Sequence, residues 1–114
     1  MEKLMSFSRD RHVTIYCKRY NRIYIPKHVY NVMLNNAKYE IDTVDVWIDN
    51  NRIKIVPNPT GEFALNRNGT SPNGRNVTLN KQAVKYYGIV EGHYPCSVEK
   101  DGTVSILLER IEEC

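Results

Sequence analysis

The segment NRIYIPKHV, residues 21–29, contains the pattern that decides the fold. Its two isoleucines, Ile23 and Ile25, alternate with bulkier polar neighbours, which predicts a short, half-buried strand. Pro26 has a fixed backbone angle and lacks an N–H group, so it suits the first position of a helix. An apolar stripe at helical spacing then continues to Leu34. The segment therefore predicts a strand that leads directly into a short helix.

The flanking residues extend this segment into a larger unit. Apolar and polar residues alternate over 12–17, which predicts a second half-buried strand joined by a turn at 19–21. After a loop over 35–42, alternation returns over 44–48 and 53–55. The residues between these two runs, 49–51, are Asp-Asn-Asn and favour a tight turn. The predicted order is strand, turn, strand, short helix and hairpin.

The same order returns after a linker over 57–62, where two prolines and a glycine exclude regular structure. We expect a strand over 63–66, a longer loop over 68–74 and a strand over 77–79. Asn80 is suited to cap a second helix, and Gly88 to end it. The last predicted hairpin pairs 94–98 with 104–108.

The chain is therefore an internal duplication. IYIPKHVYNVM, residues 23–33, aligns with VTLNKQAVKYY, residues 77–87, and VDVWIDNNRIKIV, residues 44–56, aligns with YPCSVEKDGTVSILL, residues 94–108. A repeat of about fifty residues is too small to close a core alone. We expect the two repeats to complete one sheet system around one core, as one structural domain.

The repeated pattern resembles the AbrB/MazE/SpoVT swapped-hairpin family. The motif GRIxIPxxV of that family corresponds to residues 21–29, and LGIxEGD corresponds to YGIVEGH, residues 87–93. The resemblance covers 12–56 as a first repeat and 63–108 as a second. It implies a mainly β fold with short helices: a swapped-hairpin β-barrel formed as an intramolecular pseudo-dimer. Residues 1–11 are then a basic N-terminal arm, and 109–114 an acidic tail.

The distribution of charge agrees with a nucleic-acid partner. The chain has a net charge of +3, and residues 1–56 hold ten Lys and Arg against six Asp and Glu. The family resemblance implies a double-stranded DNA-binding protein, a small transcriptional regulator. By position, it implies DNA contacts at Lys18, Arg19, Arg22 and Lys27 in the first repeat, and at Arg67, Arg75, Lys81 and Lys85 in the second. Arg9 and Arg11 would contact DNA from the arm, although plain solvated surface charge is the competing interpretation.

A protein-binding module on the same barrel, such as an antitoxin-like partner or a phage-encoded inhibitor of a host enzyme, is the alternative function. Exposed tyrosines and Trp47 suit a protein surface. Stacking on single-stranded nucleic acid is a lesser use of the same residues. A partner could also contact the acids of the second half, which are Glu99, Asp101, Glu109, Glu112 and Glu113.

Nothing in the sequence predicts an enzyme, a metal site or a cofactor. His12, His28 and His93 lack ligand spacing, and no general acid–base pair is apparent. The three cysteines, Cys17, Cys96 and Cys114, are far apart, which favours free thiols in a reducing cytoplasm. No secretory signal or membrane span is predicted. The duplication allows a monomer, while the tyrosines leave a homodimer open.

Overall fold

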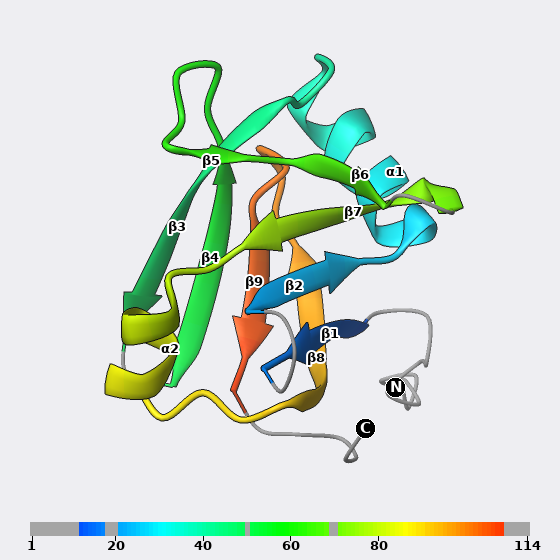
Figure 1. Cartoon of the computed structure of the whole chain (residues 1–114). Helices are drawn as coiled ribbons and strands as arrows, with labels where there is room; N and C mark the ends of the chain where they lie inside the picture. Colours follow the sequence, from blue (N-terminus) through cyan, green and yellow to red (C-terminus); the bar gives the residue numbers. More distant parts are fainter. Residues whose placement is uncertain (1–11, 18–20, 50, 69–70, 109–114) are drawn as a thin grey trace, which may run out of the picture.

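The computed structural model describes residues 12–17, 21–49, 51–68 and 71–108, which form nine strands and two helices. The fold is mainly β, and its antiparallel strands curl into a nearly closed barrel (Figure 1). The elements are β1 (His12–Tyr16), β2 (Arg22–Ile25), α1 (Lys27–Ala37), β3 (Thr43–Asp49), β4 (Arg52–Pro57), β5 (Phe63–Ala64), β6 (Asn66–Asn68), β7 (Ser71–Thr78), α2 (Lys81–Tyr86), β8 (Gly92–Val98) and β9 (Val104–Leu107).

The strand order mixes the two halves of the chain. It runs β5-β3-β4-β9-β8-β1-β2-β7-β6. Each half keeps its own hairpins, β1–β2 with β3–β4 and β6–β7 with β8–β9. Four further pairings join the halves, namely β2–β7, β4–β9, β1–β8 and β3–β5. Strands of each half therefore depend on strands of the other half as hydrogen-bonded neighbours.

Two of these pairings place corresponding residues face to face. In the β2–β7 pair, Ile23 lies opposite Val77, its counterpart in the sequence alignment. In the β4–β9 pair, Lys54 lies opposite Ser105, while Ile53 lies opposite Ile106. All four of these isoleucine and valine side chains are buried.

One apolar cluster fills the barrel, as the alternating strands predict. Side chains from β1, β2, β4, β7 and β9 are fully enclosed, including Val13, Ile25, Ile55 and Val104. Residues on the opposite face of the strands, such as Trp47, are exposed. Period-two alternation thus separates an inner from an outer surface on each strand.

The two helices differ in length and in packing. Helix α1 has 11 residues and buries Val29, Tyr30 and Met33. It continues to Ala37, beyond the predicted end at Leu34, and its C-cap is Lys38 in the left-handed region. Helix α2 has six residues, with the Asn80 side chain accepting from the Gln82 N–H at 2.7 Å. Neither described helix is long and apolar enough to cross a membrane.

The predicted loop over 68–74 is wrong. β6 ends at Asn68, and β7 already begins at Ser71 and continues to Thr78. β7 has a partner on each side, β2 and β6, so backbone hydrogen bonds form along both of its edges. The pairing with β2 covers only residues 75–78 of β7, whereas β6 pairs with Ser71 and Arg75, on either side of Asn73 and Gly74. The β6 pairing thus outweighs the turn preference of Asn73 and Gly74.

Two glycines with positive φ allow a matched test of packing. Gly102, with φ 94°, lies in the turn between β8 and β9, and a Cβ there would come within 2.9 Å of the Ala37 side chain and the Met33 carbonyl. Gly88, with φ 65°, has open space around it. We expect Gly102→Ala to lower the free energy of unfolding by about 3 kcal/mol and Gly88→Ala by about 1 kcal/mol. Urea unfolding measures both, and equal losses would contradict the α1 contact.

The pairing between halves predicts that neither half folds alone. Fragments 1–60 and 61–114, separated at exposed Thr60, should each lack a cooperative unfolding transition, because each loses four cross-half strand pairings. Mixing the fragments should restore the sheet signal in circular dichroism. A cooperative transition in either fragment by itself would show two independent cores instead.

Candidate nucleic-acid interface

Arg22 begins β2 at the end of the sheet where α2 starts. It lies opposite Thr78 of β7. The backbone N–H of Leu79 donates to the carbonyl of Asn21 at 2.6 Å, which fixes the end of the β1–β2 connection to the residues before α2. Lys81 is the first residue of α2 and is exposed. One end of the barrel therefore combines an arginine of the first half with a lysine of the second.

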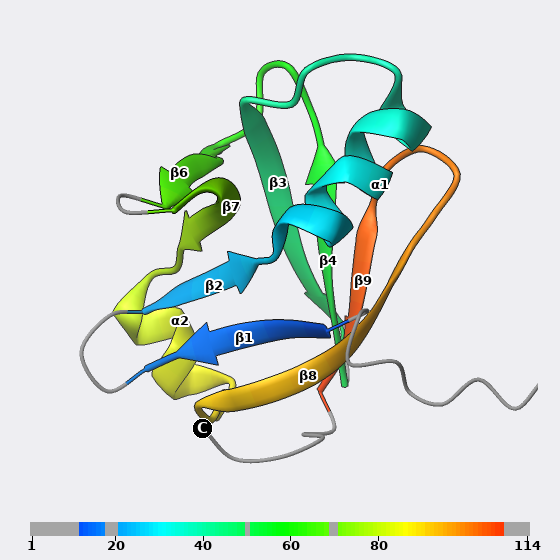
Figure 2. The same cartoon turned by 90° about the vertical axis from the view of Figure 1, so that its right-hand side faces the viewer.

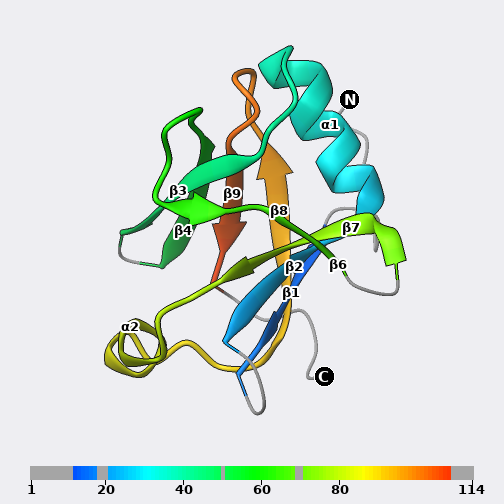
Figure 3. The ribbon, with the colours of Figure 1, turned by 45° about the horizontal axis from the view of Figure 1, so that its top comes forward.

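Lys27 lies at the opposite end of β2, as the first residue of α1 (Figure 3). A strand advances about 3.3 Å per residue, so Arg22 and Lys27 are separated by roughly 15 Å along the chain direction. Arg22 and Lys27 therefore lie at opposite ends of β2. Figure 2 shows β2 running from the side of α2 to the start of α1. Arg22 is the first residue of β2, and Lys27 starts the helix that follows β2, so the strand separates them.

Arg75 is near Lys27 rather than near Arg22. It lies opposite Ile25 at the α1 end of the β2–β7 pair. Its guanidinium stacks over the ring of Tyr30 at 4.1 Å, and its Nη1 donates to the carbonyl of Gly74 at 3.0 Å. A cation–π contact of this kind holds the charge in place beside the helix.

Five of the predicted DNA-contact residues therefore form two groups at opposite ends of the β2–β7 pair. We call Arg22, Lys81 and Lys85 the α2-end cations, and Lys27 and Arg75 the α1-end cations. Lys85 is exposed in the last turn of α2. Arg67 belongs to β6, with its backbone paired to Arg75. Four predicted contacts lie outside the described residues, namely Arg9, Arg11, Lys18 and Arg19.

One carboxylate lies beside Cys17, the residue after β1, at the end of the β1–β2 pair where Arg22 stands. An oxygen of Glu91 accepts the backbone N–H of Cys17 at 2.9 Å. The Cys17 thiol donates to the carbonyl of Ile89 at 3.7 Å. Burial raises the pKa of the Cys17 thiol, and the nearby Glu91 charge raises it further. Cys17 is therefore a neutral packing residue at neutral pH, as its place on an apolar strand face predicts.

The strand pairing also brings together two histidines that sequence spacing kept apart. The rings of His12 and His93 meet edge to face, 5.3 Å between centroids. Thr14 Oγ1 lies 2.8 Å from His93 Nδ1, and Thr14 is opposite His93 in the β1–β8 register. Only the pairing of β1 with a strand about eighty residues later creates this contact. Within the described ranges, no group of three or more His, Cys, Asp and Glu side chains is arranged to hold a metal.

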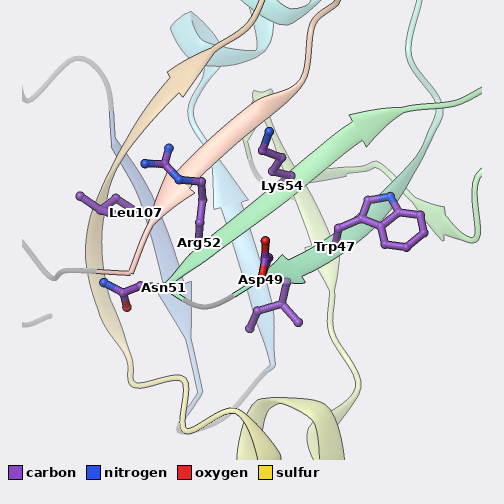
Figure 4. Close-up of a pocket in the computed structure, with 7 residues that line it drawn as sticks. Trp47, Asp49, Asn51, Arg52, Lys54 and Leu107 are labelled. Atoms are coloured by element: carbon purple, nitrogen blue, oxygen red, sulfur yellow. The ribbon is translucent and has the colours of Figure 1, made fainter.

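A second surface, unrelated to the predicted DNA contacts, lies on the outer face of β3, β4 and β9. A hollow of about 570 Å³ is lined there by Trp47, Arg52, Lys54 and Leu107, among others. Figure 4 shows Trp47, Arg52 and Lys54 along the β3–β4 pair, with Leu107 at the end of β9. Arg52 donates to Ser105 Oγ at 2.7 Å, and Lys54 lies 3.5 Å from a Glu99 oxygen. The sequence identified only Trp47 here.

No family model matches the chain, and searches of curated proteins and of solved structures give no match either.

The raised pKa of Cys17 leads to a test of this end of the barrel. Alkylation of Cys17 by iodoacetamide, followed by peptide mass spectrometry, should have a pH midpoint above that of the urea-unfolded chain. Because the folded pKa is the higher one, the thiol's contribution to stability is complete below the unfolded pKa and is lost as pH rises through the folded pKa. Glu91→Gln should move the midpoint down, since the amide keeps the acceptor but removes the charge. Glu99→Gln is the distant control, and an unmoved midpoint in Glu91→Gln would contradict the contact.

Proposed function

We propose that the two halves form a swapped-hairpin pseudo-dimer of the AbrB type. The strand register supports this proposal. A residue that lies opposite its own counterpart, as Ile23 lies opposite Val77, marks the position of a two-fold axis in an antiparallel pair. The pairing of β4 with β9, centred on Lys54 and Ser105, marks a second such position. The same two-fold relation would place the β1–β8 pair in correspondence with the β3–β5 pair, since each joins one strand from each half.

We further propose that the protein binds double-stranded DNA and acts as a small transcriptional regulator. The observation that supports this best is the hydrogen bond between Leu79 N–H and the Asn21 carbonyl. It joins the residue before Arg22 to the residues that lead into α2, so the start of β2 and the start of α2 lie at the same end of the barrel. Arginine suits guanine edges as well as phosphates, and lysine suits phosphates.

The proposed DNA surface is asymmetric. In the sequence alignment Arg22 corresponds to Asn76, which is buried in the β2–β7 pair. Lys81 corresponds to Lys27, so each end of the pair keeps the helix-start lysine. The arginine of the α1 end, Arg75, is one residue before the position that corresponds to Arg22, and it stacks on Tyr30. The preferred DNA site should accordingly be an imperfect palindrome or have no two-fold symmetry.

Charge removal at the α2 end tests the DNA proposal. Arg22→Ala and Lys81→Ala should each weaken binding of a labelled mixed-sequence duplex, measured by fluorescence anisotropy over a range of salt. Each lost phosphate contact should lower the slope of log K against log salt by about 0.9. If Arg22 reads a base, Arg22→Ala should also cost about 1–3 kcal/mol at the preferred sequence.

Lys100→Ala is the matched control for these variants, because it removes the same charge from an exposed residue beyond β8. It should leave both the affinity and the salt slope near the wild-type values. Absence of duplex binding by the wild type at low salt would refute the proposal. Equal losses in Lys100→Ala and Lys81→Ala would reduce it to unspecific attraction by net charge.

The alternative, a protein-binding module, is favoured by one specific observation. Trp47 is 64% exposed beside Arg52 in the outer hollow. Tryptophan and arginine dominate the binding energy of protein interfaces. On this alternative, Trp47→Ala abolishes partner binding, while the α2-end variants leave it unchanged.

A further inference from the structure

An apolar cavity lies between α2 and the β3–β4 hairpin, on the inner side of those strands. Its volume is about 230 Å³. α2 contributes Ala83, Val84 and the following Tyr87, and the opposite wall is made by Val46, Ile48 and Ile53. No charged side chain is among the described residues that line it. Figure 1 shows α2 beside the ends of β3 and β4.

The cavity is a consequence of how the two repeats differ. In the sequence alignment Val29 corresponds to Ala83, and Tyr30 to Val84. Tyr30 of α1 is only 5% exposed, and its hydroxyl donates to the carbonyl of Ile41 at 3.3 Å. A tyrosine ring therefore occupies the space under α1, whereas the space under α2 faces a valine and an alanine.

The end of α2 enlarges the difference. Met33 of α1 is fully buried, but Tyr87, which corresponds to it, is 51% exposed. Helix α2 stops at Tyr86, so Tyr87 is already the C-cap residue. Its ring packs edge to face on Tyr86, with 4.8 Å between centroids. The third anchoring side chain of the first helix thus has no buried counterpart in the second.

We propose that this cavity binds a small anionic amphiphile, a molecule with one apolar ring or short aliphatic chain and one carboxylate or sulfonate. An apolar cavity of about 150 Å³ takes up benzene, so this volume admits a somewhat larger apolar group. The negative charge of the ligand is inferred from α2, which has two lysines and no acidic residue over its length. Lys81 and Lys85 are four residues apart, so both exposed side chains lie on one flank of α2, next to the face on which Val84 lines the cavity.

The test uses 8-anilinonaphthalene-1-sulfonate as the fluorescent probe and octanoate as its competitor, with the full chain. The wild type should bind the dye, and octanoate should displace it. Octylamine, which has the same chain and the opposite charge, should not. Val84→Tyr restores the residue of the first repeat at this position and should raise the dye Kd at least about tenfold by filling the cavity. Lys81→Gln with Lys85→Gln should raise the apparent octanoate Kd by about threefold.

Gln82→Ala is the control, because Gln82 is exposed on α2 and does not line the cavity. It should leave dye binding unchanged. Ala83→Leu fills the cavity from the neighbouring position, so it provides the test if Val84→Tyr does not melt cooperatively.

Dye binding that persists in both filling variants would overturn the proposal. So would equal displacement by octylamine and octanoate, or equal loss in Gln82→Ala. Ligand binding in this cavity is independent of the proposed DNA binding, because none of these measurements includes DNA. A failure to bind DNA therefore leaves the outcome of these measurements unaffected.

Discussion

The antiparallel pairing of β2 with β7 is the interaction on which the rest of the structure depends. Neither strand is at an edge of the sheet. β2 pairs with β1 in one hairpin, β7 pairs with β6 in another, and the two hairpins meet where β2 pairs with β7. Ile23 and Val77 bring the two local hairpins together with their apolar faces inward. Once this pair forms, β1 can reach β8, β3 can reach β5, and the two halves enclose a shared cluster. A strand pair made by residues far apart in sequence thus determines which local hairpins become neighbours.

The same pairing determines which charged residues meet. Because β2 and β7 run antiparallel, the start of one lies beside the end of the other. The residue before Arg22 therefore contacts the residues that lead into α2, through Asn21 and Leu79. Lys27 and Arg75 come together at the far end for the same reason. Each group of cations belongs to both halves, so neither half presents its own group as a unit.

Local pattern was sufficient to predict most elements, but not the contacts between them. Alternation around Ile23 and Ile25, followed by Pro26, correctly predicted β2 and α1, since both signals are local. The segment over 68–74 was predicted as a loop because its Asn and Gly residues favour turns, whereas pairing with β6 at Ser71 and Arg75 holds the described residues 71–74 in a strand. The separation of Arg22 from Lys27 was available from strand geometry alone. The approach of His12 to His93 was not, because it depends on a pairing that spans most of the chain.

Divergence between the repeats has a different physical effect at each kind of position. Inside the barrel, an exchange such as Ile23 for Val77 keeps the apolar character, and both residues remain buried. On the sheet, the exchange of Arg22 for Asn76 removes a cation from one end only. Under the helices, the exchange of Tyr30 for Val84 removes an aromatic ring from an enclosed position, and packing around the shorter α2 does not close the space. Core positions are constrained because both halves share them, whereas a helix face is packed by one helix at a time. The smaller side chain under α2 therefore leaves a cavity there, while the strands of the barrel keep their pairing.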